Sequence, residues 1–321
     1  MYTIAQLEEK VEQWLSVLEF PETPESLYQP MRYALASGGK HLRPVLTLLC
    51  TDLFLQNVET RHVRAALALE LFHCFSLIHD DIMDKASVRR GKPTLVARWG
   101  LSTAILAGDA MLIEAYKTLS HAPHHLDVEK TFSAAAIEVC EGQQLDIDYE
   151  LLPRITQEQY FAMIGKKTAA LFAASAIVGA QMGSAPNAVL PQLHRFAYQL
   201  GLAFQLRDDY LDVYAETPEF GKTLGHDILA GKKTYLFVAT CDGLDDDDRT
   251  QFLRLMQAPL YGDEKVTMVK DFYAKAHAAE QLREAENRCF DQAMQSLSQA
   301  SLTYSKEPLR CFADTLLQRK T

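Results

Sequence analysis

The stretch RHVRAALALELFHCFSLIHDDIMD, residues 61–84, decides the fold. We expect it to form one long helix that begins near Thr60 and ends in three aspartates, Asp80, Asp81 and Asp84. Asp80 and Asp84 are four residues apart, so they share one helix face. Two carboxylates this close repel each other unless a cation lies between them or one is protonated. Oxygen ligands of this kind suit Mg²⁺, although a single DDxxD is also typical of a solvated helix end.

The same pattern occurs a second time, as Asp208-Asp209-Tyr210-Leu211-Asp212, again at the end of an apolar helix. The copies are more than a hundred residues apart, so local low complexity does not explain them. Two such clusters facing each other could hold several divalent ions inside a helical bundle. A diphosphate would balance the positive charge of those ions, so the pair of clusters predicts a site for a diphosphate ligand.

Bulk composition restricts the class of protein. The chain has 321 residues, is 48% hydrophobic and carries a formal net charge of −10. This charge argues against a general surface for nucleic acids or anionic membranes. The six cysteines include no CxxC pair, which favours reduced thiols in a cytoplasmic protein over a zinc site or disulfides. We expect no signal peptide and no transmembrane span.

Working outward from residues 61–84, nearly every segment has helical character and strand-type alternation is almost absent. We expect Pro30 in the first turn of its helix, where proline is tolerated, and a polar loop at 85–93. The chain is therefore predicted to be all-α, a single domain over residues 1–321 with ten or more helices. The other expected helices cover residues 3–19, 27–36, 44–56, 102–120, 128–149, 156–178, 189–213, 234–241, 246–258, 263–300 and 306–319.

Basic residues lie at several of the expected helix ends. Each alone is more typical of a solvated surface charge, but together they suggest two pockets for diphosphate, because Arg binds phosphate oxygens in bidentate fashion and Lys acts as a point charge. These residues are Lys40, Arg43, Arg89, Arg90, Lys167, Lys222 and Lys232.

The order of the motifs resembles the trans-isoprenyl diphosphate synthases, the head-to-tail prenyltransferases that include farnesyl and geranylgeranyl diphosphate synthases. The resemblance covers about residues 30–235. It rests on GGKxxRP (38–44), LxHDDxxD with RRG (77–91), GDA (108–110), GQ with Gln143, KT (167–168), QxxDDxxD (205–212) and GK…DxxxGKKT (221–234). The basic tail at 317–320 is a weaker similarity.

The resemblance implies a role for each matching residue. Mg²⁺, three ions per active site, would be held by Asp80 and Asp84 on one side and by Asp208 and Asp212 on the other, with Asp81 and Asp209 in support. The allylic diphosphate would be held by Arg89, Lys167, Lys232 and Lys222, and that of isopentenyl diphosphate by Lys40, Arg43, His73 and Arg90. Thr168 and Gln205 would present dipoles near the carbocation, and the catalytic set would be Arg89, Lys167, Thr168 and Gln205.

The resemblance also implies a fold and a reaction. The fold would be the isoprenoid synthase type I bundle around a deep central cavity. The reaction would be ionisation of the allylic diphosphate, condensation with isopentenyl diphosphate and elimination of a proton, with the departed diphosphate as base. The family implies a homodimer, and the apolar helix at 102–120 is a candidate interface.

Bulky residues below the first aspartate cluster set product length in this family. Here the bulky residues are Phe75 and, nearly one turn deeper, Phe72, and the neighbour of Phe75 is the small Ser76. This arrangement, with a plain DDxxD, resembles synthases of the geranylgeranyl type and favours a C20 product over the C15 alternative. The phenylalanines could instead be ordinary core residues, with Met111 or another neighbour as the floor of the cavity.

Two further classes share part of the pattern. A class I terpene cyclase should lack GGKxxRP and a second DDxxD, and both are present. A non-catalytic subunit of a heteromeric synthase should have lost aspartates or basic ligands, and none is missing. The synthase interpretation is therefore favoured over both.

Overall fold

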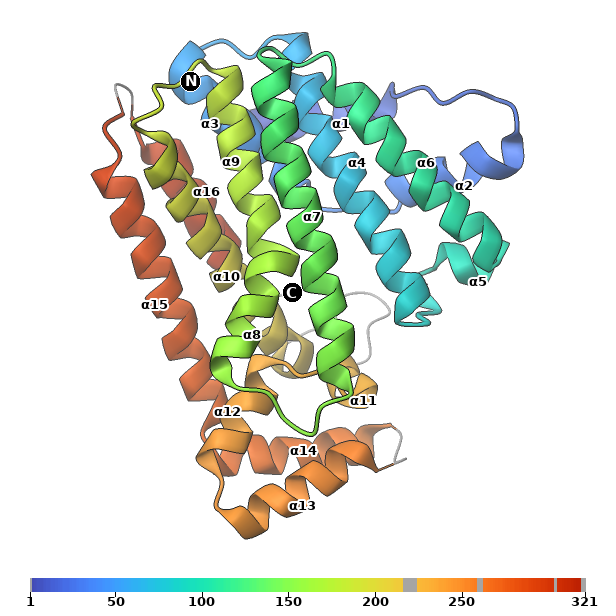
Figure 1. The fold of residues 1–321 in the computed structure, drawn as a ribbon, viewed down its shortest axis with the longest axis vertical. Coiled ribbons are helices and arrows are strands. Elements are labelled where there is room, and N and C mark those ends of the chain that lie inside the picture. The colour runs from blue at the N-terminus through green and yellow to red at the C-terminus, as the bar shows by residue number, and fades with distance from the viewer. Residues whose placement is uncertain (1, 216–223, 259–261, 303–304, 319–321) are drawn as a thin grey trace.

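The structure is a computed structural model that describes residues 2–215, 224–258, 262–302 and 305–318. It is a bundle of helices with one short β-hairpin, which confirms the all-α prediction (Figure 1). The elements are α1 (Ile4–Ser16), α2 (Glu25–Leu35), α3 (Leu42–Leu55), α4 (Thr60–Met83), β1 (Val88–Arg89), β2 (Lys92–Pro93), α5 (Leu95–Trp99), α6 (Leu101–Leu119), α7 (His125–Glu150), α8 (Gln157–Ile164), the π-helical segment η1 (Gly165–Ala169), α9 (Ala170–Met182), α10 (Leu190–Tyr214), α11 (His226–Ala230), α12 (Tyr235–Gly243), α13 (Asp246–Gln257), α14 (Asp263–Lys275), α15 (Ala278–Gln299) and α16 (Glu307–Leu317).

Long helices form the body of the bundle. Helix α4 packs on α6, α10 packs on α15, and α9 contacts α3, α7 and α10 (Figure 1). Helix α9 is apolar all round and almost wholly buried, as expected for a helix enclosed by others. The segment Gln157–Met182 is long and apolar enough to cross a membrane, but 78% of its apolar window is buried inside the protein.

Three helix predictions were wrong in detail. Pro30 lies inside α2 and not in its first turn, because the helix already begins at Glu25. The segment 263–300 is two helices, since His277 has a left-handed backbone with φ of 52° and separates α14 from α15. Short helices α5 and α11 were not predicted, because five residues give too little periodicity to recognise.

The segment 156–178 begins as predicted, with Thr156 as the N-cap of α8, but it is not one regular α-helix. Its residues 165–169 form η1, a π-helical turn that carries Lys167 and Thr168. Two glycines on neighbouring helices allow close approach to this turn. A Cβ on Gly142 of α7 would lie 2.2 Å from the backbone nitrogen of Lys167, and one on Gly201 of α10 would lie 2.7 Å from the Cα of Ala169.

The predicted polar loop after α4 contains a tight hairpin. Strands β1 and β2 are antiparallel, with Arg89 opposite Lys92. Arg90 and Gly91 form the turn and have φ of 51° and 71°, the left-handed geometry of a two-residue hairpin turn. The hairpin therefore fixes the backbone of both arginines of the RRG motif.

One cavity of about 350 Å³ lies between α1, the loop before α3, and α16. Its lining includes Lys40 and His41 but no aspartate of either cluster. The deep central cavity implied by the family resemblance stays a prediction.

Candidate active site

The first aspartate cluster is located at the C-terminal end of α4. Asp81 is buried and accepts a hydrogen bond of 2.7 Å from Nε of Arg89. Burial raises the pKa of Asp80, and the nearby carboxylates Asp84 and Asp146 raise it further, although Lys167 and Arg89 act in the opposite direction. The end of α4 therefore gathers several acids that a cation would stabilise.

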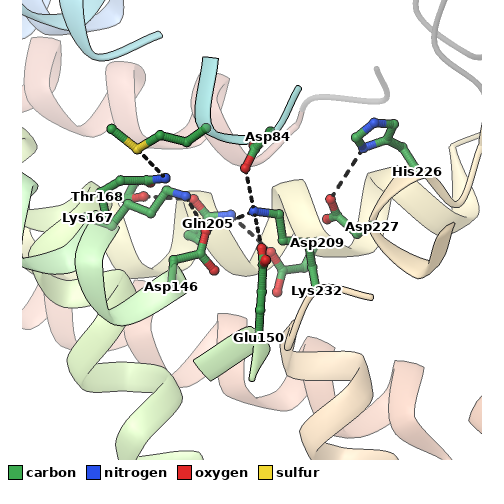
Figure 2. Close-up of polar contacts among 12 residues, drawn as sticks. Asp84, Asp146, Glu150, Lys167, Thr168, Gln205, Asp209, His226, Asp227 and Lys232 are labelled. Atoms are coloured by element: carbon green, nitrogen blue, oxygen red, sulfur yellow. Dashed lines mark hydrogen bonds and ion pairs between the residues drawn. The ribbon is translucent and has the colours of Figure 1, made fainter. Parts of the chain in front are cut away.

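Lys232 joins this cluster to α7. Its Nζ lies 2.9 Å from Asp84, 3.2 Å from Asp146 and 2.8 Å from Glu150 (Figure 2). Asp146 also accepts a 2.5 Å hydrogen bond from Lys167 of η1. Burial alone would raise the pKa of Asp146, but these two lysines lower it overall. One buried carboxylate thus holds two of the three lysines predicted to bind the allylic diphosphate.

Asp146 and Glu150 were not among the predicted site residues. Asp146 falls on the buried stripe of α7, three residues after Gln143 and four after Gly142. A carboxylate on an otherwise buried stripe is a signal that sequence reasoning could have used, because such a group needs a partner. For Glu150 we find no comparable signal.

The second cluster is located in the last turns of α10, where Asp209 faces the interior. Its carboxylate accepts hydrogen bonds from the Tyr160 hydroxyl at 2.7 Å, the Tyr235 amide at 2.9 Å and Nε2 of Gln205 at 3.0 Å. Burial raises the pKa of Asp209 to about 7. The hydroxyl of Thr168 donates to Oε1 of Gln205 at 2.8 Å, which extends the chain of hydrogen bonds into η1.

Charges from both aspartate clusters affect the pKa of one histidine, His226. Nδ1 of His226 of α11 lies 3.9 Å from the Asp227 carboxylate, an ion-pair distance (Figure 2). Asp227 raises the pKa of His226 most, burial lowers it, and the charges of Asp212 and Asp84 raise it further. Asp212 also accepts a hydrogen bond of 3.1 Å from the Asp227 amide. The last aspartates of both clusters therefore lie within electrostatic reach of the same imidazole.

A second group of cations surrounds His73 on α4. Burial lowers the pKa of His73 well below its ordinary value, and Arg43, Arg90 and Arg89 lower it further. Arg43 is buried against the ring of Phe172, its pKa is lowered to about 10 by burial, and its Nε has no hydrogen-bond partner among the described residues. Buried cations without a full set of partners are suited to an anion.

Arg90 reaches back to the loop before α3. Its Nη1 donates to the carbonyl of Gly38, and a Cβ on Gly39 would approach the same nitrogen to 3.0 Å. Lys40 follows in this loop and is exposed in the cavity beside α16. The predicted ligand Lys222 and the tail residues Arg319 and Lys320 lie outside the described residues.

The donor set fits a divalent metal that is shared with a ligand. Within the described part of the chain, no three Asp, Glu, His or Cys side chains gather closely enough to hold a metal ion alone. Mg²⁺ is commonly bound by one or two carboxylates together with substrate phosphates. The two sets of aspartates supply such carboxylates, so a metal here would need the diphosphate to complete its coordination.

The predicted floor residues are packed below the first cluster. Phe72 is 1% exposed and Phe75 is 9% exposed, with ring centroids 5.4 Å apart. Ser76 donates to the carbonyl of His73 at 2.9 Å. Met111 is fully buried in the same cluster of core residues.

Comparison with known sequences finds relatives that are named as isoprenyl diphosphate synthases. The polyprenyl synthetase family profile matches residues 24–276. The chain is 39% identical to a geranylgeranyl diphosphate synthase of Methanosarcina mazei over 67% of each chain. It is 34% identical to a short chain isoprenyl diphosphate synthase of Methanothermobacter thermautotrophicus over 93% of this chain and 92% of the relative. A geranylfarnesyl diphosphate synthase of Natronomonas pharaonis is 36% identical over 70% and 72%.

Comparison with solved structures finds the same kind of relative. A crystal structure of a geranylgeranyl pyrophosphate synthase superimposes with a TM-score of 0.92 and 34% identity, and the match covers 100% of both chains. The architecture is thus the same over the full length.

Proposed function

The chain belongs to the polyprenyl synthetase family, and from this premise we propose that it joins isopentenyl diphosphate head-to-tail to an allylic diphosphate and releases a C20 diphosphate. The observation that carries the proposal is a chain of contacts that joins the two aspartate clusters. Lys232 contacts Asp84 through its ammonium group and Asp227 through its amide, and the amide of Asp227 donates to Asp212. Lys167 reaches the same site through Asp146, which it shares with Lys232. The whole chain, residues 1–321, acts as one catalytic domain in the cytoplasm.

Two groups of basic residues bind the two substrates, one group for each diphosphate. Arg89, Lys167 and Lys232, with Lys222, hold the allylic diphosphate beside the aspartates. Lys40, Arg43, His73 and Arg90 hold the diphosphate of isopentenyl diphosphate. The support for this division is that Lys167 and Lys232 share Asp146, whereas Arg43 and Arg90 both lower the pKa of His73. Arg89 also lowers the pKa of His73, and its place in the first group rests on its hydrogen bond to Asp81.

The cofactor would be Mg²⁺, three ions per active site. Asp80 of α4 and Asp84, the C-cap of α4, would hold it together with Asp208 and Asp212 of α10. Asp81 supports Arg89, and Asp209 supports Gln205. When bound, the metal supplies positive charge that stabilises diphosphate as a leaving group.

The protein's own residues guide the chemistry. The C–O bond of the allylic substrate breaks, leaving an allylic cation and diphosphate, which Arg89, Lys167 and Lys232 stabilise as its charge develops. The double bond of isopentenyl diphosphate forms the new C–C bond, and the proton lost in the last step goes to the departed diphosphate. Thr168 and Gln205, already hydrogen-bonded to each other, present fixed dipoles near the cation.

Product length is set by the floor that Phe75 and Phe72 form below Asp80, with Ser76 beside them. The names of the relatives from Methanosarcina mazei and of the superimposed structure support C20, whereas the relative from Natronomonas pharaonis is named for a longer product. Phe75→Ala should therefore lengthen the product, and an unchanged product would contradict the role of Phe75 as floor.

We also propose a homodimer that forms through α6. The large apolar side chains Leu101, Ile105, Leu106 and Ile113 of this helix are 39–66% exposed. An exposed apolar face of this kind is typical of an interface.

A turnover assay tests the proposed reaction. The protein is incubated with isopentenyl diphosphate and each of dimethylallyl, geranyl or farnesyl diphosphate, with Mg²⁺ or with excess chelator. We expect elongation to C20 with Mg²⁺ and none with chelator. Absence of elongation with every primer would contradict the proposal.

A further inference from the structure

A continuous stack of rings in tilted and edge-to-face contact, with no pair parallel, leads from the first aspartate cluster into the core. His79, the residue before Asp80, has its ring centroid 4.7 Å from that of Phe75. The stack continues from Phe75 to Phe72 and from Phe72 to Phe132 of α7, at 5.4 Å in each case. Phe132 then contacts Tyr116 of α6 at 5.1 Å. The ring of Phe75 thus contacts two other rings, those of His79 and Phe72.

The ring of His79 is wedged between α4 and α6. A Cβ added to Gly108 would lie 2.3 Å from Nε2 of His79, so only glycine leaves room for the imidazole at this point. The same nitrogen lies 3.4 Å from the carbonyl of Ile105 and 3.6 Å from the carboxylate of Asp109. The backbone of α6 therefore supports the side of His79 that faces away from Phe75.

The lower part of the stack is also supported by α6. Tyr116 lies two turns beyond Gly108 and its hydroxyl is 3.1 Å from the Ser133 hydroxyl of α7. Phe72 and Phe132 are almost completely buried, with exposed fractions of 1% and 0%. The rings below Phe75 are closely packed, so the ring of Phe75 cannot move down into the core.

We propose that His79 is a positioning residue for product length, which holds the ring of Phe75 in the orientation that closes the floor. This inference rests on the proposed function, in particular on the role of Phe75 as floor. His79 does not contact the reacting atoms in this account. It acts through its ring contact with Phe75, and its own ring is held in place by close contact with Gly108.

This role predicts that loss of the His79 ring lengthens the product. If the His79 ring is removed, Phe75 gains space towards α6 and its ring can rotate away from the end of the growing chain. The floor then opens, and a C20 product can be extended by another isoprene unit. A substitution that keeps a ring at position 79 should keep Phe75 in place, even though the polar contacts to Ile105 and Asp109 are lost.

The test compares product length in variants at position 79. His79→Ala and His79→Gln both remove the ring, and glutamine keeps length and polarity, whereas His79→Phe keeps a ring. The products formed from farnesyl diphosphate and isopentenyl diphosphate are separated by chain length. For His79→Ala and His79→Gln we expect the ratio of longer product to C20 to rise about three- to tenfold, the range that one aromatic contact is worth. His79→Phe should stay within about twofold of the wild type on the same scale.

Leu67→Ala is the matched control. Leu67 is a buried residue of the same helix but belongs to a different core cluster, 12 positions before His79 and so about 18 Å away along the axis. It should lower the melting temperature without lengthening the product. If Leu67→Ala lengthens the product as much as His79→Ala, general loosening of α4 explains the effect and the proposal is overturned.

Phe75→Ala separates failure of this inference from failure of its premise. If Phe75→Ala lengthens the product while His79→Ala and His79→Gln leave the ratio unchanged, the floor is correct and the role of His79 is wrong. If Phe75→Ala also leaves the ratio unchanged, the floor itself is wrong and the role of His79 falls with it. If His79→Ala does not fold, His79→Gln decides between these outcomes.

Discussion

At the scale of single residues, the site depends on carboxylates that hold cations in place. Asp81 holds Arg89, and Asp146 holds Lys167 together with Lys232. The motif residues could be predicted from the sequence because their order and spacing match a family. The partners of these residues could not, since the contacts of Asp146 with Lys167 and Lys232 depend on how α7, η1 and the segment after α11 pack together.

The ion pair between His41 and Glu70 gives a prediction for pH. His41 lies between Lys40 and α3, and its Nδ1 is 2.9 Å from the Glu70 carboxylate. Burial alone would lower the pKa of His41, but the hydrogen bond and charge of Glu70, with a smaller effect of Glu12, raise it overall against the opposing charge of Arg90. A raised pKa means that the pair stabilises the fold fully below pH 6.5 and that this stability is lost as pH rises through the folded-state pKa.

We therefore expect Glu70→Gln to lower the free energy of unfolding at pH 6 by about 1 kcal/mol, since a charged hydrogen bond is roughly twice as strong as a neutral one. Above the folded-state pKa the difference should shrink to the part that comes from the attraction between Glu70 and Arg43, which stays charged over this range. Urea unfolding from pH 6 to pH 9 measures this. The control is Glu8→Gln, because Glu8 lines the same cavity as His41. A difference between Glu70→Gln and the wild type that stays constant at all pH values would contradict the prediction.

At the scale of elements, long helices could be predicted from periodicity, whereas local departures from it could not. The sequence 165–169 reads as continuous helix because a π-helical turn adds a residue without changing composition. The hairpin at 88–93 is too short for strand alternation to be recognised, although Arg90-Gly91 is a usable turn signal. Both departures position predicted ligands, Lys167 and Thr168 in one and Arg89 and Arg90 in the other.

The close approach of α7 to η1 gives a prediction for Gly142→Ala. The new Cβ would meet the Lys167 backbone at 2.2 Å, and backbone atoms cannot move aside as a flexible side chain would. We expect the free energy of unfolding to fall by about 1–3 kcal/mol and KM for the allylic substrate to rise, because Lys167 is displaced. Gly243→Ala is the comparison, since its Cβ would meet the Ala276 carbonyl at 3.0 Å, a tight contact that a small shift relieves, so it should cost less stability and leave KM unchanged. Unchanged stability and KM would show that α7 and η1 are not tightly packed.

At the scale of the whole molecule, the all-helical fold was predicted correctly because the chain carries helical apolar patterns along almost its full length. Assembly is a separate question. The sequence named the apolar helix at 102–120 as a candidate interface, but which of its apolar side chains are exposed depends on how α6 packs in the folded protein.

The proposed dimer predicts that Leu106→Asp with Ile113→Asp gives a monomer. These side chains are 59% and 66% exposed, so charges there should leave the fold intact but oppose burial against a second copy. Sedimentation velocity measures the change. Met268→Asp, on α14 at the other end of the molecule (Figure 1), is the control and should remain dimeric. A doubly substituted protein that sediments as a dimer would place the interface elsewhere.

The central claim is that both aspartate clusters hold one diphosphate through metal ions. Calorimetric titration of inorganic diphosphate in the presence of Mg²⁺ tests it most directly, using wild type, Asp80→Asn, Asp208→Asn and the control Asp246→Asn, whose side chain is 96% exposed on α13. The account predicts that Asp80→Asn and Asp208→Asn each weaken binding at least about tenfold, or 1.4 kcal/mol, while the control binds as the wild type does. Wild-type affinity in either cluster variant would contradict it.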